Sequence, residues 1–279
     1  MPKVSVCIPT MNSERTIRAT MESVLSQDFT DFDVVVTDNG SSDRTLEIVR
    51  SFGDERIKVH AHSERIPMAE NWTRAVRNST GELVKLVCSD DLIASTCLTT
   101  QAEIMVQPDV AVVGSRYDVI DDDGVYLDKG LGLKNMCGRV DSASAMRQLV
   151  RHLPDELCPT AGILFRRSHF DSTPGFQGEF GYTFDTSLWL EFTENGAFVG
   201  CPESLAVSRA STFNVSSATS TLDKIKDLFR YKHRAYECYG GGRGPLRAAD
   251  LLVADARVVY MLARRAFIVA RSMIGRHVG

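Results

Sequence analysis

The stretch LVKLVCSDD, residues 83–91, decides the fold, because it is an apolar run that ends in two adjacent carboxylates. A short run that is rich in leucine and valine and begins after Gly81 is typical of a buried strand in a parallel sheet. Open α/β sheets bind ligands at the carboxyl ends of such strands. Asp90 and Asp91 repel each other there, and a divalent cation bound to phosphate oxygens would offset the repulsion. The alternative is that both aspartates lie in the turn before a helix, where aspartate is a favoured N-cap residue.

Expected strands and helices alternate over the first ninety residues. Valine-rich runs predict strands, and apolar residues at helical spacing predict helices between them. Strands are expected over residues 4–8, 33–37 and 57–60 and in the run that ends at Asp90; one helix would be capped by Ser13 and another would cover residues 68–76. Four strands separated by helices predict right-handed βαβ units and a parallel sheet.

Polar residues follow three of these strands, at residues 10–12, 38–39 and 90–91. They should converge, because the carboxyl ends of parallel strands meet at one edge of a sheet. A Gly-Ser-Ser turn at residues 40–42 would offer backbone N–H groups to an anion, so the pocket would suit a nucleoside diphosphate. The chain has neither GxGxxG nor GxxxxGK[ST], so we expect a metal rather than a glycine loop to neutralise the diphosphate.

The composition is that of an ordinary globular protein, with 43% apolar and 24% charged residues among 279. A net charge of −4 provides no overall field that would attract nucleic acid. The seven cysteines lack CxxC or Cys/His metal spacing, and their odd number favours a reducing compartment. The N-terminus runs directly into a strand, leaving no room for a signal peptide, and no apolar run reaches the length of about 18 residues that predicts a membrane span. We therefore expect a cytoplasmic protein.

The middle of the chain predicts more strands and one hairpin. We expect a strand over residues 109–114, a hairpin that turns at residues 121–124, a helix over 142–150 and a strand over 162–167. The hairpin turn is acidic, but it lacks the spaced ligands and terminal glutamate of an EF-hand, so a solvated turn is expected. Arg166 and Arg167 are expected to have surface or structural roles.

The last seventy residues predict helices, over residues 222–239 and 246–274, separated by a glycine-rich breaker. From Ala256 to Gly279 there are five arginines and no acidic residue, and Arg257, Arg264 and Arg271 recur every seven residues. A basic amphipathic helix can lie on an anionic membrane surface. The alternatives are that it packs on the rest of the chain or in a homodimer, with its arginines solvated.

Four segments, residues 4–12, 23–27, 34–43 and 88–91, together resemble the inverting glycosyltransferases of family 2, which have the GT-A fold. The resemblance implies an α/β, Rossmann-like and mostly parallel sheet flanked by helices. It implies a GT-A domain over residues 1–215, with a nucleotide-binding half at about 1–95 and an acceptor half at about 96–215. Residues 216–279 would form a helical C-terminal extension.

The resemblance also implies roles for single residues. The metal, Mn2+ or Mg2+, would bind Asp91. The nucleotide sugar would contact Pro9, Thr10, Met11, Asn12, Asp38, Asn39, Arg74, Ser89 and Asp90. Four positions depart from the family pattern, since Met11 replaces an aromatic residue, Asn39 an acidic one, Cys88 an aspartate and Phe184 the first member of an acidic pair. The changes at positions 11 and 39 leave UDP, dTDP and GDP open as donor nucleotides.

Inverting transfer needs a carboxylate that takes the proton of the acceptor hydroxyl. Residues 185–190, DTSLWL, match the family's helix that begins with the base, so Asp185 is the expected base, with Glu179 as a fallback. Asp185 could instead only cap that helix. The acceptor would be a glycan or a lipid-linked glycan, which would place the protein in the cytoplasm, with the inner face of the plasma membrane as a peripheral site.

Two other functions remain open. A catalytically inactive nucleotide-sugar-binding or scaffold protein could keep the same fold. A nucleotidyltransferase is a third reading, but it would need a basic, glycine-rich loop after the first strand, which residues 10–14 do not provide.

Overall fold

The computed structural model describes residues 1–156, 158–181, 183–211 and 219–275, with side chains described up to Leu262. Its strands are β1 (Val4–Thr10), β2 (Phe32–Asp38), β3 (Ile57–Ala61), β4 (Leu83–Leu86), β5 (Leu92–Ile93), β6 (Val110–Ile120), β7 (Tyr126–Leu131), β8 (Gly138–Val140), β9 (Leu164–Arg166) and β10 (Ala197–Arg209). Its helices are α1 (Ile17–Leu25), α2 (Thr45–Ser51), α3 (Met68–Arg77), α4 (Cys97–Ile104), α5 (Ser142–His152), α6 (Arg167–Asp171), α7 (Phe184–Phe192), α9 (Thr221–Tyr239) and α10 (Ala248–Gly275). Two short 3-10 turns, η1 (Thr160–Gly162) and η2 (Thr193–Asn195), complete the described elements.

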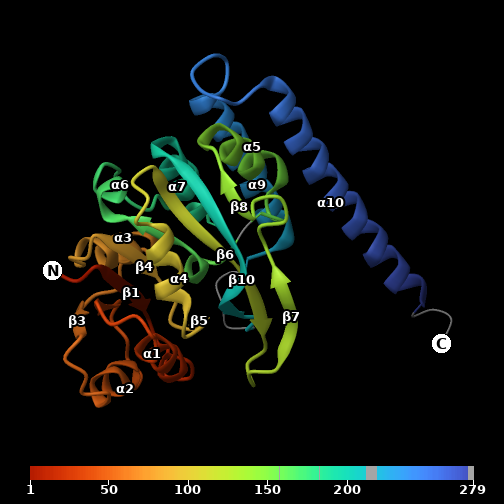
Figure 1. Ribbon diagram of the computed structural model, residues 1–279. Coiled ribbons are helices and arrows are strands. Elements are labelled where there is room, and N and C mark those ends of the chain that lie inside the picture. The colour runs from red at the N-terminus through yellow and green to blue at the C-terminus, as the bar shows by residue number, and fades with distance from the viewer. Residues whose placement is uncertain (157, 182, 212–218, 276–279) are drawn as a thin grey trace.

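The strands form one sheet with the order β3-β2-β1-β4-β9-β6-β10-β5, in which β7 also pairs with β6 and β8 with β10. Helices cover the sheet, and the long α10 runs along one side of the molecule (Figure 1). The strands of both expected halves thus belong to the same sheet.

The first four strands pair in parallel, as expected. All seven residues of β1 and all seven of β2 are buried, because helices cover both faces of this part of the sheet. Successive side chains alternate between the faces. Val6 and Ile8 join the core that contains residues of α1, α2 and α4, whereas Cys7 joins the core that contains residues of α3, α7 and α9.

Beyond β4 the sheet becomes mixed. Strand β9 pairs antiparallel with β4 and β6, and β6 then pairs parallel with β10. The expected strand over residues 162–167 is shorter than predicted, because Thr160–Gly162 forms η1 and Arg167 begins α6. Arg166 has the expected structural role, since its guanidinium donates to the carbonyl oxygens of Met105, Gln107 and Val110.

The expected hairpin is confirmed as the antiparallel pair β6–β7. Its turn is closed by the Asp121 carboxylate, which accepts from the backbone N–H groups of Asp123 and Val125. The predicted cap of α1 is wrong. Thr16 is the N-cap residue, and the Ser13 hydroxyl lies 2.7 Å from the Ser89 hydroxyl instead of capping the helix.

The C-terminal helices pack on the rest of the fold. Buried residues of α9 and α10 join the core beneath α5 and α7. Arg257 of α10 forms an ion pair with Asp155 rather than being solvated by itself. Within the part of the chain that the structure describes, no helix is long and apolar enough to cross a bilayer.

Candidate functional site

A pocket of about 540 Å³ lies at the carboxyl ends of β1 and β4, which is a volume suited to a small-molecule ligand. Strands β2 and β4 leave β1 on opposite sides, so the chain changes direction there, as at ligand sites of other open α/β sheets. The predicted site residues that line the pocket are Pro9, Thr10, Met11, Asn12, Asn39, Ser89, Asp90, Asp91 and Asp185. Asp38 and Arg74 are not among the residues that line it.

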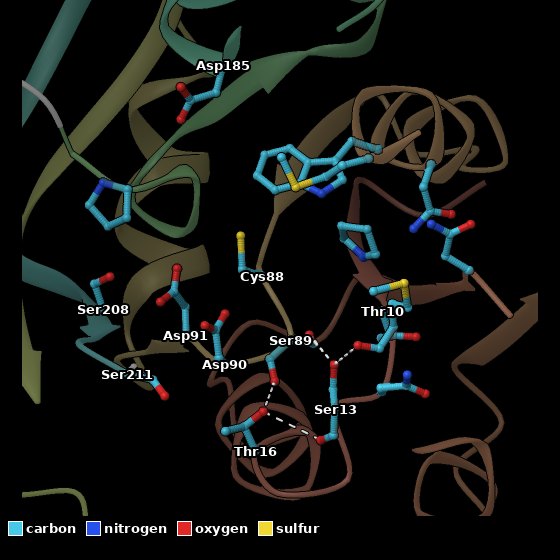
Figure 2. Close-up of a pocket in the computed structure, with 18 of the residues that line it drawn as sticks. Thr10, Ser13, Thr16, Cys88, Ser89, Asp90, Asp91, Asp185, Ser208 and Ser211 are labelled. Carbon is cyan, nitrogen blue, oxygen red and sulfur yellow. Dashed lines mark hydrogen bonds between the residues drawn. The ribbon is translucent and has the colours of Figure 1, made fainter. Parts of the chain in front are cut away.

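The loop that carries the acidic pair is fixed by the start of α1. The Thr16 hydroxyl donates to the Ser89 carbonyl oxygen at 2.8 Å, and the Thr20 hydroxyl donates to the Asp91 carbonyl oxygen at 2.9 Å. Figure 2 shows the bond between Thr16 and Ser89 below the two carboxylates. The hydroxyl groups hold the loop through its main chain, so the carboxylates of Asp90 and Asp91 are left facing the pocket.

The Asp91 carboxylate is buried beside a second negative charge. Burial first and the neighbouring Asp90 second raise its pKa well above the usual value. The Arg209 backbone N–H donates to Asp91 Oδ1 at 3.3 Å and offsets part of this effect. Ligand atoms of Cys88, Asp90 and Asp91 lie within 4.8 Å of one another. Two crowded carboxylates with oxygen donors fit a hard divalent cation such as Mg2+ or Mn2+, which would remove the repulsion.

Cys88 lies at the edge of this acidic pair and lines the pocket. Its Sγ is 3.4 Å from the Thr160 hydroxyl. Burial, Asp91 and Asp90 raise the pKa of the thiol well above the usual value, so it stays protonated and adds no third negative charge. The aspartate-to-cysteine departure thus lowers the charge of the site.

Asp185 lies across the pocket from Asp90 and Asp91, at the first turn of α7 (Figure 2). It is not the N-cap residue of that helix, which is Thr183. Its Oδ1 accepts from the backbone N–H and the hydroxyl of the adjacent Thr186. Burial raises the pKa of Asp185 to about 6, which brings this carboxylate towards the range in which a general base works at neutral pH.

The start of α7 is held from behind by the C-terminal part of the chain. Asp227 of α9 is buried, and its Oδ2 accepts from the Thr183 backbone N–H at 3.3 Å. The apolar residues around Asp185 pack as an aromatic cluster, in which the ring of Trp72 lies 4.8 Å from that of Phe184. The first turn of α7, which carries Asp185, is therefore held both by the hydrogen bond from Thr183 to Asp227 and by the packing of Phe184 on Trp72.

The strand ends at residues 10–12 and 38–42 converge as predicted, but their polar groups mostly bind one another. Asp38 is buried and accepts from the Thr10 hydroxyl and from the N–H and hydroxyl of Ser41. The Asn12 carboxamide oxygen accepts from the Ser42 N–H, with Asn12 at a positive φ of 50°. The turn at residues 40–42 thus directs the N–H groups of Ser41 and Ser42 to this chain's own side chains, not to the pocket.

Asn39 lines the pocket, but both ends of its carboxamide are occupied. Its Oδ1 accepts from the Ile66 N–H at 2.8 Å and its Nδ2 donates to the Ile66 carbonyl oxygen at 2.9 Å. These bonds attach the segment before α3 to the end of β2. Asn39 therefore shapes one wall of the pocket through Ile66.

The cations around the pocket differ from those expected. Arg74 forms an ion pair with Glu70 one turn earlier on α3, so its guanidinium is engaged at the helix surface. Arg209 donates to the carbonyl oxygens of Asp90 and Asp121 and so joins the acidic loop to the hairpin. Arg15 and Arg65 line the pocket instead. Both are exposed loop residues without a motif of their own, so no local pattern indicated them.

Other pocket residues also come from distant parts of the chain. Trp72 supplies an aromatic side chain from α3, while Ser208 and Ser211 approach Asp91 from the end of β10. Trp72 could have been suspected, since Met11 leaves the pocket without its expected aromatic residue. No local pattern in the sequence indicated the two serines, because they reach Asp91 only when β10 pairs with β5 and β6 in the folded sheet.

Comparison with known proteins gives both sequence and structural matches. The family model described as "Glycosyl transferase family 2" matches residues 5–172. The "UDP-Glc:alpha-D-GlcNAc-diphosphoundecaprenol beta-1,3-glucosyltransferase WfgD" of Escherichia coli is 29% identical over 122 residues, which are 44% of this chain and 48% of that protein. The chain thus spans about half the length of this curated relative.

Two solved structures share the fold. S. aureus TarS 1–349 in complex with UDP-GlcNAc has a TM-score of 0.67 at 22% identity, over 84% of this chain and 66% of that one. Mannosyltransferase PcManGT from Pyrobaculum calidifontis, in complex with GDP-Man and Mn2+, has a TM-score of 0.62 at 18% identity, over 96% of this chain and 81% of that one. At these identities the likeness shows the fold alone, and the expected α/β GT-A class is confirmed.

Proposed function

Because this chain belongs to glycosyltransferase family 2, we propose that it transfers a sugar from a nucleotide-diphosphate sugar to an acceptor hydroxyl, with inversion at the anomeric carbon. One observation carries the proposal. The pocket has an acidic pair on one side and a single carboxylate with a raised pKa on the other. We take the acidic pair as the place for the diphosphate and the Asp185 side as the place for the acceptor.

On the acceptor side, Asp185 would take the proton of the attacking hydroxyl as its oxygen bonds to the anomeric carbon. A carboxylate with a pKa of about 6 is ionised at neutral pH and is a stronger base than an ordinary aspartate. The start of α7, held through Thr183 by Asp227, would keep the carboxylate in place during the transfer.

On the donor side, Asp91 would hold a divalent cation, with Asp90 beside it. When bound, such an ion would neutralise the diphosphate and stabilise the charge of the departing nucleotide. The exposed guanidinium groups of Arg15 and Arg65 at the pocket would favour the same anion. Trp72 lines the pocket and would offer the base the aromatic face that Met11 lacks.

The donor base remains among uridine, thymidine and guanosine in this proposal. The E. coli relative is named for UDP-Glc and a diphosphoundecaprenol-linked acceptor. We therefore take UDP-sugars as the first donors to test and a lipid-linked glycan as the acceptor. An enzyme that acts on such an acceptor would work from the cytoplasm at the inner face of the plasma membrane.

The test compares Asp185→Asn with Glu179→Gln. Glu179, the fallback base, is an exposed carboxylate that does not line the pocket, so its variant tests that fallback and also controls for loss of one acidic charge. Binding of UDP, dTDP and GDP, each with and without Mn2+, is measured by thermal shift, and transfer from UDP-glucose to alpha-D-GlcNAc-diphosphoundecaprenol by product formation. Asp185→Asn should keep metal-dependent nucleotide binding and lose transfer at least about a hundredfold, while Glu179→Gln should retain both.

Two results would contradict the proposal. Transfer at the wild-type rate by Asp185→Asn would remove its assignment as the base. Metal-dependent nucleotide binding by the wild type, with no transfer to any sugar acceptor tried, would instead favour the inactive nucleotide-sugar-binding protein. Asp91→Ala should abolish the dependence of nucleotide binding on Mn2+, because it removes the central oxygen ligand.

A further inference from the structure

Helix α10 presents an outward face that is apolar throughout its described part. The residues of this face are Ala249, Leu252, Val253, Ala256, Val259 and Tyr260. Leu252 is 70% exposed, Val259 is 56% exposed and Tyr260 is 66% exposed. Large apolar side chains that gather on one exposed helix face mark an interaction surface, whereas single ones do not.

The opposite face of α10 is fixed to the rest of the protein, so the outward face cannot turn inward. Ala254 and Val258 are fully buried. The buried Lys232 of α9 donates to the Ala254 carbonyl oxygen at 3.3 Å. Arg151 of α5 pairs with the buried Asp250, and Arg257 pairs with Asp155.

The sequence repeats the same spacing along the rest of the helix. Apolar residues continue at the matching heptad positions to Ile274, and α10 runs to Gly275 with its C-terminal end away from the sheet (Figure 1). Residues 256–279 contain five arginines and no acidic residue, a charge of +5. Since the whole chain has a net charge of −4, residues 1–255 carry −9. Helix α10 itself, Ala248–Gly275, holds four of these arginines and two aspartates, Asp250 and Asp255, so its positive charge lies in the C-terminal part of the helix that bears the apolar face.

We propose that α10 lies on an anionic lipid surface, with this apolar face inserted among the lipid chains. A helix with an apolar face and a basic flank suits the boundary between headgroups and chains, where arginine pairs with lipid phosphate. A second copy of this chain is a poorer partner. Two copies of residues 256–279 would bring ten arginines together without an acidic residue in either segment.

Charge also distinguishes α10 from the other exposed apolar group. Val125, Tyr126 and Leu127 are exposed on the hairpin, but four aspartates, residues 121–123 and 128, lie within it. An anionic surface would repel this hairpin. The acidic remainder of the chain would likewise be kept off the membrane, leaving α10 as the contact.

The experiment is vesicle sedimentation of the full chain. Vesicles of phosphatidylcholine alone are compared with vesicles of phosphatidylcholine and phosphatidylglycerol in equal parts, at low and high salt. The wild type should sediment with the anionic vesicles at least about tenfold better than with the neutral ones, and high salt should reduce this difference. The double variant Val259→Glu/Tyr260→Glu should stay in the supernatant, because it places two charges on the exposed apolar face.

Val106→Glu is the matched control. Val106 is 73% exposed and lies outside α10, so its variant adds an acidic group without touching the face. It should sediment like the wild type. Equal sedimentation of the wild type and the double variant would overturn the proposal. A second result would also overturn it: the wild type binds neither type of vesicle and elutes as a dimer, whereas the double variant elutes as a monomer. None of these readouts depends on sugar transfer, so they stand apart from the test of Asp185.

Discussion

Asp185 is the residue whose surroundings change its chemistry most usefully. The sequence motif at residues 185–190 implied that Asp185 is the base. The structure adds that burial at the start of α7 raises the pKa of its carboxyl group. Asp38 shows the reverse. It was predicted to contact the nucleotide, yet its carboxylate is occupied by Thr10 and Ser41, so in this structure it holds the strand ends together.

The first prediction concerns the pH dependence of transfer. A base works only when it is unprotonated, and the pKa of Asp185 is raised from 3.8 to about 6. We expect kcat/KM to fall about tenfold for each pH unit below about 6. The measurement is a pH–rate profile at saturating Mn2+, because a metal ion at the proposed site would keep the acidic pair ionised. A profile that stays flat down to about pH 5 would contradict the raised pKa.

The second prediction concerns stability. A carboxyl group whose pKa is higher in the folded than in the unfolded state destabilises the fold when it is charged. For Asp185 this cost is fully present above about pH 6 and disappears below about pH 4. The free energy of unfolding of Asp185→Asn should therefore be about 2 kcal/mol higher than that of the wild type at neutral pH. This value is smaller than the full pKa shift would give, because the Asp185 side chain is partly exposed. Denaturant titrations should show the two proteins converging at about pH 4.

At the scale of elements, the valine-rich strands and the helices between them followed their sequence patterns. The exceptions lie where side-chain contacts decided the geometry. Ser13 was expected to cap α1, but its hydroxyl lies beside that of Ser89, and α1 begins three residues after the expected start. The short β9 was expected as a strand, but its antiparallel partners β4 and β6 could not be predicted from its own residues.

The third prediction tests the contact between α9 and α7. Asp227→Ala removes the acceptor for the Thr183 N–H and should lower kcat about tenfold with little change in the donor KM, because a base that shifts by a fraction of an ångström loses its alignment. Asp227→Asn keeps an acceptor oxygen and should restore most of kcat. Equal kcat values for the alanine variant and the wild type would mean that the contact does not position Asp185.

At the scale of the molecule, one sheet joins the expected nucleotide-binding and acceptor halves. The pocket lies where the parallel part meets the mixed part, so the acidic pair and Asp185 come from elements about a hundred residues apart in sequence. The C-terminal helices are integrated into the fold, since residues of α9 and α10 join the core next to α7.

The fourth prediction compares neighbouring valines of α10. Val258 is fully buried and Val259 is 56% exposed, so the two differ in face but not in residue type. Val258→Ala should lower the free energy of unfolding by about 2 kcal/mol, whereas Val259→Ala should change it by less than about 0.5 kcal/mol. Thermal or denaturant unfolding measures both. Equal effects would mean that α10 does not pack on the body through this face.

The sequence by itself determined the α/β class, the parallel pairing of the first four strands, the family and nine of the residues that line the pocket. These depend on local patterns, in which apolar periodicity and polar strand ends are encoded within short segments. Tertiary structure alone decided that Asp38 and Asn39 bind their own chain, that Arg74 pairs with Glu70, and that Arg15, Arg65 and Trp72 line the pocket. It also decided the pKa of Asp185, because desolvation and hydrogen-bond partners depend on residues that are distant in sequence and become neighbours only when the sheet and helices pack.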